Sequence, residues 1–164
     1  MDVTEKIAAL EARLRTVEDH QAILNLLNTY GPLVDSGSSE EVVKLWVEGG
    51  GYNYTRPGGG DGRLDAPDGL LTLYGSPPHL EMIATGSAHM TLTPKISIDG
   101  DDAQAVGYSM VVEREGDRWF VERASVNHWI LKRQPDGWRI VERFNRTLTG
   151  SDESHEVMRG VLAI

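Results

Sequence analysis

The chain of 164 residues contains no cysteine. Disulfides, thiolate nucleophiles, cysteine-ligated zinc and iron–sulfur clusters are therefore excluded. No apolar run approaches the roughly 20 residues that a membrane-spanning helix needs. Residues 1–11 are charged and lack the apolar core of a secretory signal. We therefore expect a soluble, cytoplasmic protein.

Positive charge is also scarce, because 16 Lys and Arg residues stand against 25 Asp and Glu residues and leave a net charge of −9. A negatively charged surface repels phosphate backbones and anionic lipids, so we expect neither nucleic acid nor a membrane as a partner. The sequence has no serine elbow, and no helix follows the glycine run at 58–60 to form a phosphate loop. No cluster has metal-ligand spacing, so we expect no metal and no cofactor.

The first part of the chain has a helical pattern. Apolar residues recur in alternating steps of three and four, which predicts a helix over residues 2–30: Ile7, Leu10, Leu14, Val17 and Leu24. This narrow stripe suits contact with a neighbouring subunit or with the outside of a sheet, and equally an ordinary surface helix on its own core. Gly31-Pro32 is predicted to interrupt the helix. A second helix is predicted over 40–47, ending at the glycines of 49–51.

The rest of the chain reads mainly as strands. We predict a short strand at 52–55, a loop at 56–69 that could act as a lid, and a short helix at 77–84. Four long strands separated by turn residues are then predicted at 88–98, 102–115, 118–133 and 137–149. This order predicts one α+β domain over 1–164, with an N-terminal helix extension (1–16) and a C-terminal tail (150–164) that could cover a pocket or a neighbour.

Three segments carry a resemblance to a known family: "AILNLLNTYGPLVDSGSSEEVVKLW", "AHMTLTPKISIDGDDAQAVGYSMV" and "NHWILKRQPDGWRIVERFNRTL". From about residue 17 to 149 the chain resembles the SnoaL-like branch of the nuclear transport factor 2-like superfamily. Its members include scytalone dehydratase, hexachlorocyclohexane dehydrochlorinase and bile acid 7α-dehydratase. The resemblance implies a cone-shaped fold, in which a strongly curved antiparallel or mixed sheet and helices packed on one side enclose a pocket.

The resemblance also implies a catalytic pair, His89 and Asp35, with Tyr30 one helical turn before the aspartate. An aromatic residue on the first strand recurs in this branch and corresponds to Tyr52 or Tyr54. A late arginine corresponds to Arg146, with Arg143 as the less favoured register. Gly31-Pro32 departs from the family pattern and could move Tyr30 relative to the pocket.

These residue types suit an elimination without a cofactor. Histidine titrates near neutral pH and can act as a base, and a carboxylate on its far nitrogen fixes the tautomer and stabilises the imidazolium. Tyrosines and an arginine can stabilise the negative charge that develops on the substrate. Scytalone dehydratase has a second pocket histidine on the following strand. This chain has no histidine at residues 106–110, and Tyr108 is the nearest polar residue that could take its place. Asn127 alternates with His128, and we expect Asn127 to face the cavity.

Each of these residues also has a purely structural interpretation. Asp35 could cap the turn after the helix, the tyrosines could belong to the core or its rim, and the arginines could pair with surface acids. His20, His79 and His155 lie in surface-like sequence contexts.

We expect a lyase, dehydratase or isomerase that acts on a small, mostly apolar, oxygenated ring compound such as a polyketide, a steroid or an aromatic metabolite. The alternatives are a polyketide-type cyclase and a non-catalytic protein that binds a small molecule or mediates oligomerisation. Because members of this fold cover the open sheet with another subunit, the resemblance also implies a homo-oligomer, with a trimer favoured over a dimer.

Overall fold

The computed structural model describes residues 2–56 and 58–164 of the chain. Helix α1 runs without a break over Val3–Asp35, and Pro32 lies inside it. The predicted interruption at Gly31-Pro32 is therefore wrong. Proline removes one backbone donor, but its carbonyl accepts the Ser36 N–H (3.1 Å), and the helix continues far enough to bury Val34.

A mixed sheet of seven strands forms the body of the fold, in the order β2-β1-β7-β6-β5-β3, with β4 paired to β5. Strands β1 and β7 are parallel and the other pairs are antiparallel. The strands are β1 (Trp46–Thr55), β2 (Asp61–Asp65), β3 (Ser87–Thr91), β4 (Lys95–Asp99), β5 (Asp102–Glu115), β6 (Arg118–Gln134) and β7 (Gly137–Thr147).

The second half of the sequence prediction needs one correction. The strand predicted at 88–98 is two strands, β3 and β4, which both pair with β5 and are separated by residues 92–94. Pro94 lies in this break, where a residue without a backbone donor cannot continue the ladder. The strands predicted at 102–115, 118–133 and 137–149 match β5, β6 and β7 to within two residues.

The region around the predicted loop differs more. Strand β1 begins at Trp46, directly after α2 (Ser39–Val42) and the 3-10 helix η1 (Val43–Leu45), so the glycines at 49–51 lie inside a strand instead of ending a helix. The register of β1 against β7 shifts between Trp46 and Gly51, so these glycines lie at an irregularity of the strand, a position at which glycine often occurs. Strand β2 and the start of α3 (Asp68–Tyr74) occupy half of the predicted loop, of which residue 57 lies outside the described residues.

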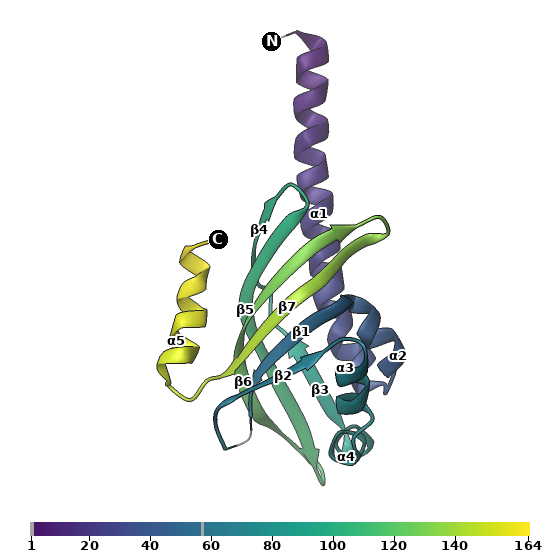
Figure 1. The fold of residues 1–164 in the computed structure, drawn as a ribbon, viewed down its shortest axis with the longest axis vertical. Helices are drawn as coiled ribbons and strands as arrows, with labels where there is room; N and C mark the ends of the chain where they lie inside the picture. The colour runs from purple at the N-terminus through teal and green to yellow at the C-terminus, as the bar shows by residue number, and fades with distance from the viewer. Residues whose placement is uncertain (1, 57) are drawn as a thin grey trace.

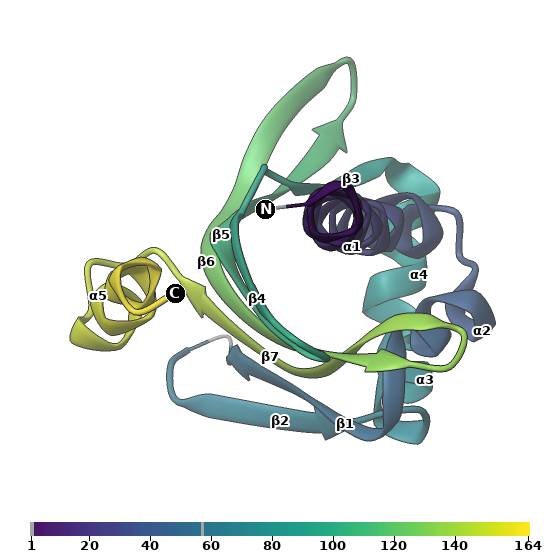
Figure 2. The same ribbon diagram turned by 90° about the horizontal axis from the view of Figure 1, so that it is seen from above.

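The helices lie on both faces of the curved sheet (Figures 1 and 2). Seen from above, α1 lies in the hollow of the sheet, and α4 (Pro77–Thr85) packs against β3 and β5. Helix α5 (Asp152–Arg159) lies on the outer face and contacts β5, β6 and β7. The C-terminal tail therefore covers the convex face and not the hollow.

The core lies between α1 and the concave face of the sheet. Its fully buried side chains include Ile23, Leu27, Leu131 and Ile140, each of which contributes about 1.5–3 kcal/mol by burial. An ion pair closes one end of this core, because both Arg133 amino groups donate to the Asp19 carboxylate, at 2.7 and 2.6 Å. In the described part of the chain, no helix is long and apolar enough to cross a membrane.

Candidate active site

Gly31 sets the distance between α1 and β3. A Cβ atom built on Gly31 would lie 1.9 Å from the carbonyl oxygen of His89, far inside van der Waals contact. Only glycine therefore permits this approach of helix to strand. Asp35, one helical turn further on, is brought against β3 by the same contact.

Asp35 and His89 lie together, as the family resemblance implied. The His89 ring contacts the Asp35 carboxylate through Nδ1 (2.7 Å to Oδ1), and the His89 backbone N–H donates to Oδ2 (2.6 Å). The Ser87 hydroxyl donates to Oδ1 as well (2.7 Å). The carboxylate thus accepts three hydrogen bonds, which hold it in one orientation.

These hydrogen bonds decide the charge of Asp35. Burial by itself raises the pKa of the carboxyl group, but the hydrogen bonds from His89 and Ser87 outweigh burial and bring the pKa below its ordinary value. Asp35 is therefore ionised at neutral pH and can only accept. It follows that Nδ1 of a neutral His89 carries the proton, which leaves Nε2 as the basic nitrogen.

His89 lies on the wall of a cavity of about 670 Å³, between the concave face of the sheet, the end of α1 and helix α4. This size is typical of pockets for small molecules. Tyr30, Tyr52 and Tyr54 also line the cavity, and the rings of Tyr52 and Tyr54 stack at 5.3 Å on one face of β1, as the spacing predicted. The ring of Tyr30 meets the His89 ring edge-on at 6.3 Å.

Of the two arginines on β7 that the resemblance offered for the cavity, Arg143 lines it and Arg146 does not; Arg123 on β6 lines it as well. Strand β7 has one extra residue opposite β6, because Ile130 pairs with Glu142 whereas Leu131 pairs with Ile140. Such a bulge reverses which side chains face the core. Arg143 therefore shares the concave face with Ile140, although an unbroken alternation from Ile140 would have placed Arg146 there.

Arg143 is held in an unusual environment. Its side chain is 4% exposed, and the guanidinium lies 4.6 Å from the Tyr30 ring centre and 4.8 Å from that of Tyr52. Its Nε donates to Asn127 Oδ1 (2.9 Å). No carboxylate lies within ion-pair distance of Arg143 among residues 2–56 and 58–164. A buried cation without a counter-ion thus faces the cavity.

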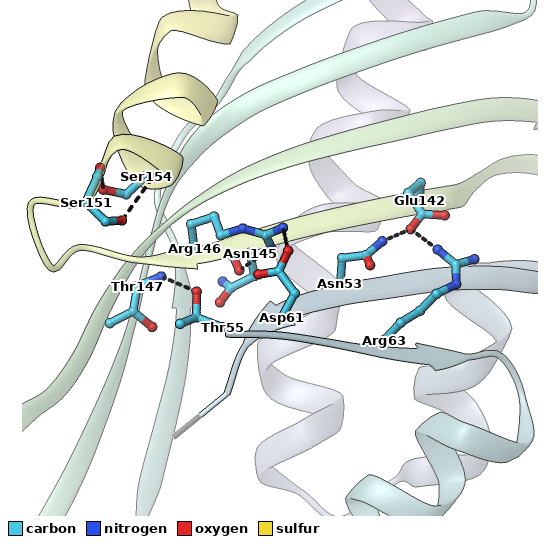
Figure 3. Close-up of polar contacts among 10 residues, drawn as sticks. All are labelled: Asn53, Thr55, Asp61, Arg63, Glu142, Asn145, Arg146, Thr147, Ser151 and Ser154. Carbon is cyan, nitrogen blue, oxygen red and sulfur yellow. Dashed lines mark hydrogen bonds and ion pairs between the residues drawn. The ribbon is translucent and has the colours of Figure 1, made fainter. Parts of the chain in front are cut away.

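Two predicted substrate-binding residues lie elsewhere. Arg146 points to the other face of β7, where it donates to Asp61 at 2.9 Å (Figure 3). Tyr108 is 47% exposed on the face of β5 opposite Ser109, and its hydroxyl lies 3.9 Å from the sulfur of Met158 in α5. Neither lines the cavity.

Asn127 lies on the concave side of β6, as expected from its alternation with His128. It is fully buried beneath the cavity and does not line it. Its amide donates to the Ser109 hydroxyl (2.8 Å), and its oxygen accepts from Asn145 (2.8 Å) as well as from Arg143. Asn127 therefore positions Arg143. His128 lies on the other face and pairs with Gln104 (2.8 Å).

The sequence reasoning missed His79. This residue was expected at the surface but is 9% exposed, lines the cavity, and has its ring 6.1 Å from that of His89. Burial lowers the pKa of His79, the neighbouring His89 lowers it further, and Asp35 and a backbone hydrogen bond to Val34 act in the opposite direction. The spacing of His79 and Met82, three residues apart in α4 and both lining the cavity, was the available signal.

Two buried polar atoms beside this cavity have no hydrogen-bond partner in the described part of the chain: His79 Nε2 and the hydroxyl of Tyr74. Their rings lie 5.5 Å apart. Buried polar groups are normally paired; the Tyr74 hydroxyl has the Tyr30 hydroxyl beside it, which leaves His79 Nε2 as the buried polar atom without a partner next to the cavity within residues 2–56 and 58–164. No group of three or more His, Asp or Glu side chains able to hold a metal ion occurs among the described residues.

The curved sheet with a helix in its hollow is the cone-shaped, cystatin-like fold of the nuclear transport factor 2-like proteins. A protein of this description from Novosphingobium aromaticivorans has 33% sequence identity and a TM-score of 0.86, over 96% of this chain and 97% of its own. A protein of unknown function from Mycobacterium tuberculosis shares the fold at 16% identity (TM-score 0.71, over 94% and 90%). So does a protein from Catenulispora acidiphila in complex with S-DNPA, at 20% identity (TM-score 0.62, over 85% and 94%).

Within this fold, the model of the SnoaL-like domain matches residues 15–144. The chain therefore belongs to the SnoaL-like domain family, which includes polyketide cyclases, isomerases and dehydratases. No curated protein matches the chain.

Proposed function

We propose that the chain is a cofactor-independent dehydratase, another lyase or an isomerase, with His89 as its general base. The observation that carries this proposal is the His89–Asp35 pair on the wall of an aromatic cavity. The proposed substrate is a small, mostly apolar, oxygenated ring compound, because tyrosine and methionine side chains supply apolar parts of the cavity wall and the many polar side chains among them can bind oxygen atoms.

In the proposed reaction, Nε2 of His89 takes a proton from a substrate carbon. The electron pair of the broken C–H bond moves into the ring system toward an oxygen atom. The imidazolium that forms is stabilised by the ionised Asp35, which also keeps Nδ1 protonated and the ring in place. A base positioned in this way contributes roughly 100- to 10,000-fold to the rate.

Arg143 is proposed to stabilise the negative charge on that oxygen. Its guanidinium is buried, keeps its charge and has no carboxylate partner in the described part of the chain. In a dehydration, the electron pair then returns to form the double bond, and the hydroxyl group leaves with a proton as water. Tyr52 is proposed as the donor of that proton, because its hydroxyl group belongs to the cavity wall and burial keeps it protonated by raising its pKa.

The test compares His89→Ala with His128→Ala in a screen of hydroxylated ring compounds. We expect turnover by the wild type and by His128→Ala, since His128 lies on the convex face. His89→Ala should lose at least about 100-fold in kcat and still bind the substrate in calorimetry. Full activity of His89→Ala would refute the proposed base, and binding without turnover by the wild type would favour a non-catalytic binding protein.

A further inference from the structure

The N-terminal part of α1 leaves the body of the protein. Figure 1 shows this part of the helix extending beyond the sheet. We call residues 3–17 the arm. Its five large apolar side chains are between 51% and 72% exposed: Val3, Ile7, Leu10, Leu14 and Val17. An apolar stripe of this length on a projecting helix indicates a contact surface.

The arm residues do not face the body. At 100° per residue, the stripe points about 160° away from the side chains with which α1 packs on the sheet, such as Asp19, Ile23 and Leu27. The protein's own core therefore cannot cover the stripe. A partner on the stripe would also lie clear of the body.

The spacing of the stripe is that of a coiled coil. The intervals from Val3 to Val17 are four, three, four and three residues, which places Ile7 and Leu14 at the a positions of a heptad and Leu10 and Val17 at the d positions. The stripe stops at Gln21, next to the point where Asp19 joins the body through Arg133. Two heptads thus lie outside the body.

The charges beside the stripe identify the partner. The g positions carry Lys6 and Arg13, and the e positions carry Glu11 and Glu18. In a parallel coiled coil, each g residue meets the e residue five positions later on the other helix, so Lys6 would pair with Glu11 and Arg13 with Glu18 of the second copy. An antiparallel pair would instead bring e against e and g against g, which places like charges together.

We infer that the arm forms a parallel coiled coil with the arm of a second copy of this chain. Lys6, Glu11, Arg13 and Glu18 have no ion-pair partner within their own chain among the described residues, so all four are available. Two heptads are short for an isolated coiled coil. Here, however, the helix is continuous with the packed part of α1, so association does not have to nucleate it.

Light scattering after size-exclusion chromatography tests the interface, with the wild type loaded at up to about 100 µM. The wild type should show a multiple of the 18.1 kDa monomer mass, and Ile7→Asp/Leu14→Asp should be monomeric with an unchanged melting temperature of the body. Ala9→Asp/Ala12→Asp, which adds the same charge outside the stripe, should keep the wild-type mass. A monomeric wild type, or an unchanged mass in Ile7→Asp/Leu14→Asp, would overturn the inference.

Cysteine cross-linking tests whether the two arms are parallel, and the chain has no native cysteine that could interfere. A parallel, in-register pair places Leu10 next to Leu10 of the second copy. Leu10→Cys should therefore form a disulfide-linked dimer on mild oxidation, whereas Ala12→Cys on the outer face should not. Glu11→Lys/Glu18→Lys should weaken association at least tenfold, and adding Lys6→Glu/Arg13→Glu should restore it. Equal cross-linking of both cysteine variants, or no effect of Glu11→Lys/Glu18→Lys, would rule out the parallel coil.

Discussion

Gly31→Ala should separate the two halves of the candidate catalytic pair without touching either residue. The added Cβ would start 1.9 Å from the His89 carbonyl oxygen, whereas non-bonded atoms need more than 3 Å. Helix α1 and strand β3 must therefore move apart by roughly 1 Å. A shift of that size would stretch the hydrogen bond from the His89 N–H to Asp35, now 2.6 Å, beyond hydrogen-bond range.

Two measurements follow from this displacement. Strain and the lost charge-assisted hydrogen bonds should lower the free energy of unfolding by about 2–4 kcal/mol, measured by urea denaturation. Because burial raises the pKa of Asp35 and the hydrogen bonds lower it, weaker bonds should raise this pKa, measured by carbon-13 NMR titration of the carboxyl group. A 1 Å displacement should also cost roughly 100-fold in catalytic rate.

Gly160→Ala is the matched control, because its Cβ would meet only Val106, at 3.7 Å, and its backbone is helical (φ −51°). It should change the free energy of unfolding by less than about 0.5 kcal/mol. If Gly31→Ala behaves like this control, with the wild-type stability and the wild-type pKa of Asp35, the close approach of α1 to β3 does not hold the pair together.

Three further predictions concern charge in and near the cavity. Folding lowers the pKa of Asp35 below 3.8. The contribution of Asp35 to stability should therefore be complete above about pH 4 and disappear as the pH falls through the folded-state pKa. In urea denaturation, the free energies of unfolding of the wild type and Asp35→Asn should differ above this range and converge below it. Arg143→Met should weaken binding of an anionic ring compound such as 2-naphthoate by roughly tenfold or more in calorimetry, whereas Arg146→Met should not, and equal losses would contradict the placement of Arg143. Proton NMR should find the pKa of His79 below 6.5 in the wild type, higher in His89→Ala and lower still in Asp35→Asn; a shift of either variant in the opposite direction would contradict the proposed coupling.

Much of the fold followed from local patterns. The steps of three and four predicted α1, and the turn residues between the last three long strands predicted β5, β6 and β7 almost to the residue. Alternation along β6 placed Asn127 on the concave side and His128 on the convex side. The pairing of His89 with Asp35 came from resemblance to a family and not from the residues alone, because 54 positions separate them.

The main errors at the site arose where a contact between distant segments decided the outcome. Gly31-Pro32 looked like a helix end, yet the glycine is the point at which α1 touches β3. His79 looked exposed in a short helix, and only the packing of α4 over the hollow buried it. The resemblance favoured Arg146 over Arg143, but a single extra residue in β7, which the sequence does not reveal, places Arg143 on the concave face.

The sequence by itself thus determined the α+β class, the long N-terminal helix with its stripe of apolar residues in steps of three and four, and the residue types available for acid–base chemistry. These features depend on periodicity, charge and turn propensity over a few residues, which a single chain segment expresses directly. Only the tertiary structure decided which arginine faces the cavity, which histidines share it, and how Asp35 is oriented. Those outcomes depend on strand register and on the distance between helix and strand to within about 1 Å. Both are set by contacts between segments far apart in the chain.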